Sequence, residues 1–177
     1  MNSERHADAQ ETLRFGYGET KIGFALVASS QRGVAAILLG SDRTKLRVEL
    51  ASAFPAVELI EDEGTLAVTA AKVAAFIDAP RRGLDLPLDP RGSALELAVW
   101  EALRNIPAGE TRSYGALAKA IALPATAQEV GAACAANRLA VAIPCHRVLK
   151  ADGSISGYRW GVWRKRRLLA LEAAEAA

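Results

Sequence analysis

The chain has 177 residues, of which 51% are hydrophobic and 24% are charged, and its net charge is +2. These proportions are ordinary for a globular protein with a hydrophobic core, and the length suits one full domain or two small ones. They exclude a protein built on membrane-spanning helices, because no apolar run approaches the roughly 20 residues that such a helix needs.

The charges are spread unevenly along the chain. Residues 1–90 hold 10 Lys and Arg against 13 Asp and Glu, whereas residues 91–177 hold 12 against 7. A basic half suggests a polyanionic partner, because phosphate contacts dominate the affinity of proteins for nucleic acids. A solvated charged surface is the alternative, and charge alone does not decide between the two.

Residues 1–11 are polar and mixed in charge, and we expect a disordered leader there. The segment lacks the apolar stretch of a secretory signal. The two cysteines, Cys134 and Cys145, give no disulfide framework. These observations predict a cytoplasmic protein, since free thiols persist in a reducing compartment.

Residues 12–80 have the pattern of a small α/β layer. Short apolar runs bounded by polar and glycine-containing loops predict strands, and apolar residues at helical spacing after a capping residue predict helices. This half contains no cluster of nucleophile, base or metal ligand, so we interpret it as a scaffold. Strands are predicted over residues 13–18, 22–28, 33–39 and 57–60, with a hairpin loop at 29–33, and helices over 42–54 and 65–77.

Residues 79–92 hold three prolines and two glycines, a composition that is typical of a connector. We place the boundary between two domains at residues 81–92. The second domain, residues 93–177, opens with a capping box in which the Glu96 side chain reaches back to the Ser93 amide. The helix that follows is predicted to end near Ile106, with Trp100 in the core.

Two further helices are predicted, over residues 113–121 and 126–137, and the second begins with a capping box of Thr126 and Glu129. Two short helices across a tight turn have helix-turn-helix proportions, although generic helical hairpins share them. The second helix carries mostly alanine and glycine. Such a surface either packs closely against another helix or approaches a nucleic-acid groove, and both interpretations stay open.

An apolar run over residues 139–143 leads into a proline and then Cys145. Such a run is typical of a buried strand or core segment, and proline stops a ladder or helix from continuing. Cys145 should therefore sit where a rigid buried segment turns towards a cavity, and our hypothesis is that its thiol accepts an alkyl group. Cys134 is predicted to be an ordinary small buried residue. The basic run at 164–167, which heads the last helix, is predicted to be a solvated helix face.

The chemistry at Cys145 depends on its neighbours. A thiolate is the nucleophile, and a nearby cation or base helps it to form. His146 is adjacent, but neighbouring side chains of an extended segment point to opposite sides, so a bridging water is the natural link. The imidazole then needs a group to orient it, and Glu172 is the best candidate in this half. A metal site made of the cysteines and histidines has no recognisable ligand spacing.

The stretch Ile143-Pro144-Cys145-His146-Arg147-Val148 resembles the active-site motif of the O6-alkylguanine-DNA alkyltransferases, also called methylated-DNA–protein-cysteine methyltransferases. Further matches in the same order cover nearly the whole chain, and several matches in the right order hardly arise by chance. The set looks most like the alkyltransferase half of bacterial Ada-type proteins. The further matches are at residues 109–115, 134–137 and 152–161.

The resemblance implies a single-use repair protein. It would flip O6-methylguanine out of double-stranded DNA and transfer the methyl group irreversibly to Cys145, without a cofactor or a metal. The implied fold is a ribonuclease-H-like α/β N-terminal domain followed by a mainly helical C-terminal domain with a winged-helix-like helix-turn-helix. We expect a monomer with no membrane partner, and cooperative assembly along DNA stays open.

The family pattern also implies roles for individual residues. Cys145 is the acceptor, His146 the water-linked base, and Glu172 the group that orients the imidazole. Asn137 braces the turn beside the active site, and Tyr114 assists rotation of the nucleotide and donates a proton to the leaving guanine. The base pocket is lined by Tyr158 and by the backbone around Val148 and Arg159, and the DNA contacts fall on Arg112, Ala127, Gln128, Gly131 and Arg138.

Two positions depart from the family pattern. The first turn of the recognition helix usually carries an arginine that fills the place of the flipped base, whereas this chain has Gln128, which is shorter and uncharged. We therefore expect slower repair of duplex DNA than with an arginine there. The neighbouring Glu129 repels phosphates unless its carboxylate is used in the Thr126 cap. Arg138 stands where a proline often follows the asparagine, and it offers a phosphate contact.

Three other functions are compatible with parts of the sequence. A damage-binding protein without transfer would share the fold, but such relatives lack the acceptor cysteine that is present here. A Cys–His hydrolase would need an oxyanion hole and direct pairing of two adjacent side chains. A regulator of the Ada type would need a zinc-bound methyl sensor, and the sequence holds no four-cysteine cluster.

Overall fold

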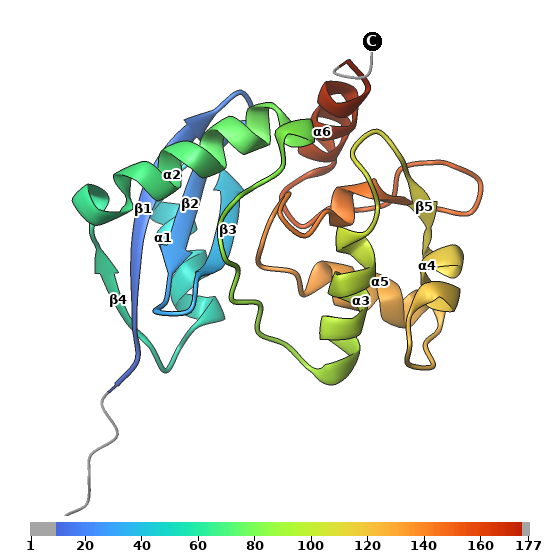
Figure 1. The fold of residues 1–177 in the computed structure, drawn as a ribbon, viewed down its shortest axis with the longest axis horizontal. Helices are drawn as coiled ribbons and strands as arrows, with labels where there is room; N and C mark the ends of the chain where they lie inside the picture. Colours follow the sequence, from blue (N-terminus) through green and yellow to red (C-terminus); the bar gives the residue numbers. More distant parts are fainter. Residues whose placement is uncertain (1–9, 175–177) are drawn as a thin grey trace, which may run out of the picture.

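The computed structural model describes residues 10–174. The chain forms two parts side by side: a sheet with two helices from the first half, and a mainly helical part from the second half (Figure 1). The predicted α/β class is confirmed. None of the helices within residues 10–174 is long and apolar enough to cross a membrane. The predicted leader, residues 1–11, lies outside the described residues except at its last two positions.

Every predicted strand and helix is present, with ends shifted by one or two residues. The first part contains β1 (Thr12–Thr20), β2 (Gly23–Ser29), β3 (Val34–Gly40), α1 (Arg43–Ala53), β4 (Glu58–Glu61), α2 (Glu63–Asp78) and the 3-10 turn η1 (Pro80–Arg82). The second part contains α3 (Ala94–Arg104), β5 (Arg112–Ser113), α4 (Tyr114–Ala120), α5 (Ala127–Ala135), the 3-10 turn η2 (Cys145–Arg147), β6 (Val148–Leu149) and α6 (Val162–Ala174).

The four-stranded sheet has the order β3-β2-β1-β4, with β4 parallel to β1 and the other neighbours antiparallel. Successive side chains of β1 point to opposite faces. Phe15 and Tyr17 therefore face α1, where Arg47 and Arg43 lie over their rings. Gly18 faces α2, and a Cβ atom there would lie only 2.9 Å from the Ala70 carbonyl oxygen. Glycine at this position thus lets the alanine-rich helix approach the sheet closely.

The outer edge of β3 is covered by two segments, one from the connector and one from the second half. The connector makes one isolated bridge, between Leu88 and Val34, and the apolar run makes another, between Leu139 and Ile37. The Ile37 amide donates to the Arg138 carbonyl at 2.9 Å, and its carbonyl accepts from the Ala140 amide at 3.0 Å. The run that leads to the cysteine is therefore docked directly on the sheet.

The apolar run over residues 139–143 is a core segment and not a strand. After its one bridge to β3 the chain makes a tight turn, in which Val141 has a φ of 67°. A β-branched residue in this left-handed region is strained, and the surrounding packing has to hold it there. Val141 and Ile143 are each about 1% exposed, which provides that packing.

Local capping signals correctly predict the starts of α3 and α5. The Ser93–Glu96 and Thr126–Glu129 capping boxes are both formed, each with reciprocal side-chain and backbone hydrogen bonds. Trp100 is buried, and its Nε1 donates to the Ala133 carbonyl at 2.9 Å. The parallel pairing of β5 with β6 was not anticipated.

The solvated-face prediction for the basic run at 164–167 is wrong for two of its four residues. Arg166 and Arg167 are exposed, but Arg164 is 7% exposed and Lys165 is fully buried. Both buried cations find oxygen acceptors from distant segments, which compensates the loss of water. Arg164 donates to the Ile22 and Trp160 carbonyls and to the Ser41 hydroxyl, at 2.7, 2.9 and 2.9 Å.

Candidate active site

Cys145 opens the 3-10 turn η2, where the apolar run ends, and it is only 4% exposed. The segment expected to be extended is therefore turned, so the alternation of side chains argued from sequence does not apply. Asn137 braces the turn as expected: its Nδ2 donates to the Ile143 carbonyl at 2.9 Å and to Cys145 Sγ at 3.4 Å. Its Oδ1 accepts from the Leu139 amide at 2.8 Å.

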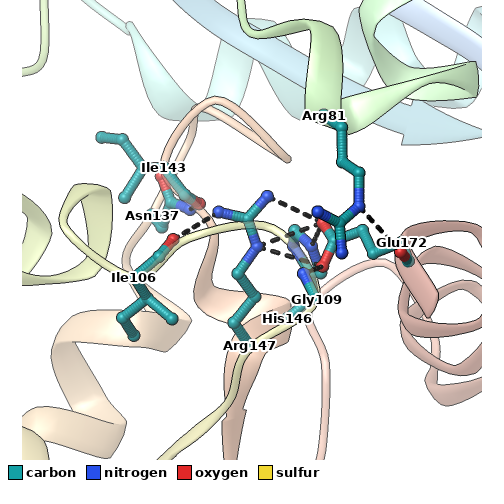
Figure 2. Close-up of polar contacts among 8 residues, drawn as sticks. All are labelled: Arg81, Ile106, Gly109, Asn137, Ile143, His146, Arg147 and Glu172. Carbon is teal, nitrogen blue, oxygen red and sulfur yellow. Dashed lines mark hydrogen bonds and ion pairs between the residues drawn. The ribbon is translucent and has the colours of Figure 1, made fainter. Parts of the chain in front are cut away.

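The expected contact between His146 and Glu172 is present. His146 Nε2 lies 2.6 Å from Glu172 Oε1, and both side chains are fully buried. Figure 2 shows that Arg147 approaches the same carboxylate, with its Nε 3.1 Å from both oxygens and its Nη2 2.8 Å from Oε1. Arg147 Nη1 donates to the Ile106 carbonyl at 2.6 Å. One carboxylate from α6 therefore holds two consecutive residues of the cysteine motif.

The chain also closes around Glu172 from the opposite side. Arg81 Nε donates to the Glu172 carbonyl at 3.2 Å, and the Gly109 amide donates to its Oε2 at 3.4 Å (Figure 2). Gly109 has a φ of 89°, and a Cβ atom there would lie 2.3 Å from Arg81 Nη2. Only glycine fits this position without displacing the arginine.

The protonation of the pair follows from its surroundings. Burial alone would raise the pKa of the Glu172 carboxyl, but the hydrogen bonds from His146 and Arg147 outweigh it and lower the pKa to about 2. Burial lowers the pKa of His146, and Glu172 offsets this only in part. A neutral imidazole beside a carboxylate carries its proton on Nε2 and donates it to Oε1. Nδ1, which is buried and has no partner among the described residues, is then free to accept a proton.

The two thiols of the site are both protonated at rest. Burial raises the pKa of Cys145, although the hydrogen bond from Asn137 and the charge of Lys165 oppose the shift. Burial also raises the pKa of Cys134, to about 12. A nucleophilic Cys145 would therefore need a base to form its thiolate. The unpartnered Nδ1 of the adjacent His146 is a group that could serve as that base.

Cys145 faces a cavity of about 370 Å³. This cavity brings together five of the residues singled out from sequence, and the hydroxyl of one of them, Tyr158, is buried without a partner among the described residues. A buried polar atom without a partner is rare and marks a position where a ligand or water can bind. The lining residues are Tyr114, Gly131, Cys134, Ala135, Cys145, Gly157, Tyr158 and Arg159.

Sequence reasoning missed two polar residues behind this cavity, Ser156 and Lys165. Tyr114 Oη makes a short hydrogen bond with Ser156 Oγ, which in turn accepts from Lys165 Nζ at 2.9 Å. Lys165 Nζ also donates to the Val148 carbonyl at 2.7 Å. Val148 itself is fully buried and does not line the cavity. Nothing in the helical pattern around Lys165 identifies it, because its partners lie outside its own helix, 17 and 9 residues earlier.

The residues expected to contact DNA are dispersed. Ala127 and Gln128 are exposed on the first turn of α5, and Arg112 is exposed and paired with Glu110 at 3.3 Å. Gly131 lies on the wall of the cysteine cavity. Arg138 lines a different cavity, of about 290 Å³, and its Nη1 is buried without a partner among the described residues.

Comparison with known proteins identifies the family. A family model described as the DNA binding domain of 6-O-methylguanine DNA methyltransferase matches residues 94–174. The bifunctional transcriptional activator/DNA repair enzyme Ada of Escherichia coli is 46% identical over 169 residues, which cover 96% of this chain and 48% of that protein. The chain thus spans about half the length of this relative.

Two further proteins match over most of their own length. A methylated-DNA–protein-cysteine methyltransferase of Methanosarcina acetivorans is 33% identical over 88% of this chain and 96% of that protein. The crystal structure of Mycobacterium tuberculosis OGT in complex with DNA superposes with a TM-score of 0.75 and 31% identity, covering 91% of this chain and 93% of that one. The chain therefore belongs to the methylated-DNA–protein-cysteine methyltransferase family.

Proposed function

We propose that the protein repairs O6-alkylguanine in double-stranded DNA by transferring the alkyl group irreversibly to Cys145. The observation that carries the proposal is a buried thiol, facing a cavity with two phenols, beside a neutral imidazole that Glu172 and Arg147 hold in place. The names of the relatives in Methanosarcina acetivorans and Escherichia coli support the same reaction and repair function. The DNA bound to the Mycobacterium tuberculosis neighbour supports DNA as the partner.

The burial of Cys145 requires the damaged base to leave the helix. An alkyl carbon on a stacked guanine cannot reach a sulfur that is 4% exposed. Flipping the nucleotide into the cavity costs a few kcal/mol, and less for a base whose pairing is already poor. The cavity volume, about 370 Å³, falls in the range of small-ligand sites.

Transfer then proceeds in one displacement. His146 Nδ1 takes the thiol proton, through a water molecule, and Sγ forms a bond to the alkyl carbon. The bond between that carbon and O6 breaks, and its electron pair stays on the purine. A phenol, Tyr114 or Tyr158, donates a proton to the departing guanine. Burial raises the pKa of both phenols, so both carry their protons before the reaction, and the charge that develops on the leaving guanine has to draw the proton from the phenol.

The product is a thioether, which water does not cleave at neutral pH, so the protein acts once. This outcome explains why one nucleophile and one base are sufficient for the reaction. Glu172 and Asn137 act on the geometry: the first orients the imidazole, and the second holds the turn and the sulfur. Lys165, near the sulfur, lowers the cost of forming the thiolate.

The finer assignments belong to the same proposal. The strand order β3-β2-β1-β4, with one parallel strand and helices on both faces, supports a ribonuclease-H-like N-terminal domain at residues 12–80. The pair α4 and α5 would form the helix-turn-helix of a winged-helix-like C-terminal domain after a connector at residues 81–92. A monomer in the cytoplasm remains the prediction, with cooperative assembly along DNA open.

The DNA contacts proposed from sequence would fall on two surfaces. The exposed first turn of α5, with Ala127 and Gln128, would enter the groove, and Gly131 would let the helix approach the flipped base. Arg112 would bind a phosphate. Arg138 is the weakest member of this set, because one of its terminal nitrogens is buried at the interface with the sheet.

The test is to mix the protein with a duplex oligonucleotide that contains O6-methylguanine and to read intact and peptide masses. We expect the mass of one methyl group on the peptide with Cys145, and none in Cys145→Ser. Cys134 is an internal control, because it lines the same cavity yet should stay unmodified. Tight, selective binding without modification of Cys145 would contradict the proposal and indicate a damage sensor.

A further inference from the structure

Arg159 joins three parts of the molecule at the rim of the cysteine cavity. It belongs to the loop between β6 and α6, which also carries Tyr158. Its Nη1 donates to the Ala135 carbonyl at the C-terminal end of α5, at 2.8 Å. Its Nε donates to Glu49 Oε1 at 3.1 Å, and Glu49 lies on α1 of the N-terminal part. A planar guanidinium suits this task, because its donors point in fixed directions.

The hydrogen bond between Arg159 and Ala135 joins two residues that both line the cavity that Cys145 faces. Ala135 and Arg159 line it from α5 and from the loop respectively. A hydrogen bond between them therefore sets how far apart these two walls can move. Cys145 lines the same cavity, so the spacing of these two walls limits the size of the group that the sulfur can reach.

Glu49, on α1 of the N-terminal part, binds Arg159 and so restrains it from outside the cavity. It lies near two cations, Arg159 and Arg138, which repel each other, and its negative charge opposes that repulsion. Without the Glu49 carboxylate, the repulsion between these two cations, which both belong to the second part, would be less compensated. The side chains of Glu49 and Arg159 are each 27% exposed, so the pair is partly shielded from solvent.

We propose that Glu49 and Arg159 form a tether through which the N-terminal part sets the width of the alkyl pocket and so limits the size of the group transferred. The inference rests on the function proposed above and assigns the scaffold half a part in substrate selection. Arg159 and Glu49 are positioning residues, because they act on the walls and not on the reacting atoms.

The experiment compares two oligonucleotide duplexes, one with O6-methylguanine and one with O6-benzylguanine, under single-turnover conditions with saturating protein. The quantity measured is the ratio of the benzyl rate constant to the methyl rate constant, in which effects on DNA affinity cancel. In Glu49→Gln the ratio should rise about tenfold, the low end of the discrimination that one pocket wall provides between hydrocarbon groups. Arg159→Ala should raise it by a similar factor.

Two controls separate the tether from general effects. The double variant should show no further rise, since both substitutions remove the same interaction. Glu63→Gln removes a comparable ion pair, with Arg43 at 3.4 Å, inside the N-terminal part and should leave the ratio unchanged. An unchanged ratio in Glu49→Gln, or an equal rise in Glu63→Gln, would overturn the proposal.

A second measurement keeps this test distinct from the test of the function. Amide hydrogen exchange in residues 157–161 should become faster in Glu49→Gln than in the wild type or in Glu63→Gln, because the loop loses its tether. If the wild-type protein transferred neither alkyl group, the proposed function would fail, whereas unchanged exchange would overturn the tether. Methyl transfer by the wild type with an unchanged ratio in Glu49→Gln would overturn the tether alone.

Discussion

Residues 12–78 and residues 93–174 fill their interiors in different ways. In the first region no polar or charged side chain is buried, and the sheet packs against its helices mainly through aliphatic and aromatic groups, with Arg43 and Arg47 of α1 over two aromatic rings of β1. In the second region six polar or charged side chains are buried. Five of them lie in or bond to residues 143–148, and the sixth, Arg164, bonds to Ile22, Ser41 and Trp160. The six are Asn137, His146, Arg147, Arg164, Lys165 and Glu172.

This difference suggests that one region mainly stabilises the fold and the other mainly positions the reactive residues. Burying a charge costs several kcal/mol before its partners compensate the loss of water, so a buried ionic network is a poor way to stabilise a fold. The same network holds the side chains in one arrangement, and group transfer depends on such fixed geometry. The apolar half therefore supplies stability, and the half with buried charges uses some of that stability to hold Cys145, His146 and their partners in place.

The largest expected effect is at the centre of the buried network. Glu172→Ala leaves the Arg147 cation unpaired and His146 without its acceptor, so the free energy of unfolding should fall by about 3–5 kcal/mol. Urea denaturation measures this change. Alkyl transfer by the molecules that remain folded should also slow, because the imidazole is no longer oriented. A loss below about 1 kcal/mol would mean that solvent reaches the site and replaces the carboxylate.

The pH dependence of the same network has a defined sign. The pKa of Glu172 is lowered from its ordinary value of 4.5 to about 2, so its ionised form stabilises the folded state above pH 4.5. This contribution is lost as the pH falls from 4.5 towards 2. The difference in unfolding free energy between wild type and Glu172→Gln should therefore shrink over that range. A constant difference would contradict the assigned shift.

A substitution that creates a cavity in the core of the apolar half should lower stability without changing the rate of transfer. Leu26 of β2 is fully buried, and Leu26→Ala should cost about 3 kcal/mol through lost packing. Methyl transfer per folded molecule should match the wild type, because no part of the site touches this residue. The measurement pairs urea denaturation with a single-turnover rate corrected for the folded fraction. A specific loss of rate would show that the first half shapes the site more widely than through Glu49.

The smallest effect is expected on the exposed surface of α5, where activity should change without stability. Gln128→Arg should speed alkyl transfer from duplex DNA by about threefold to tenfold, because a longer cationic side chain fills the space left by the flipped base. Ala127→Arg adds the same charge one residue away and serves as the control for general attraction to phosphates. Equal acceleration in both variants, or none in Gln128→Arg, would contradict the role assigned to position 128.

The elements of the fold were predictable because their signals are local. The short apolar runs bounded by loops and the two capping boxes depend on residues within a few positions of each other, and the predicted strands and both boxes are present. His146 stood out because it follows Cys145, and Glu172 because the second half contains few acidic residues. These two facts were sufficient to predict their contact.

The errors have a common cause, which is dependence on partners outside the local helical pattern. Lys165 was expected in solvent because it lies in a run of four basic residues, but its acceptors are the Val148 carbonyl and Ser156. Arg164 was misjudged for the same reason, since its acceptor at Ile22 lies 142 residues away. Local hydrophobic patterns contain no information on such oxygens. The 3-10 turn at Cys145 likewise depends on Asn137 and on docking against β3.

Because the connector and the second half dock on the edge of β3, the two halves are not independent modules that could be exchanged separately. A cut within residues 81–92 would release a sheet whose edge, at Val34 and Ile37, has lost its hydrogen-bond partners. Such open edges pair with other chains, so the N-terminal fragment should associate with itself. Chimaeras of related proteins would therefore have to exchange β3 together with the 139–143 segment that lies on it.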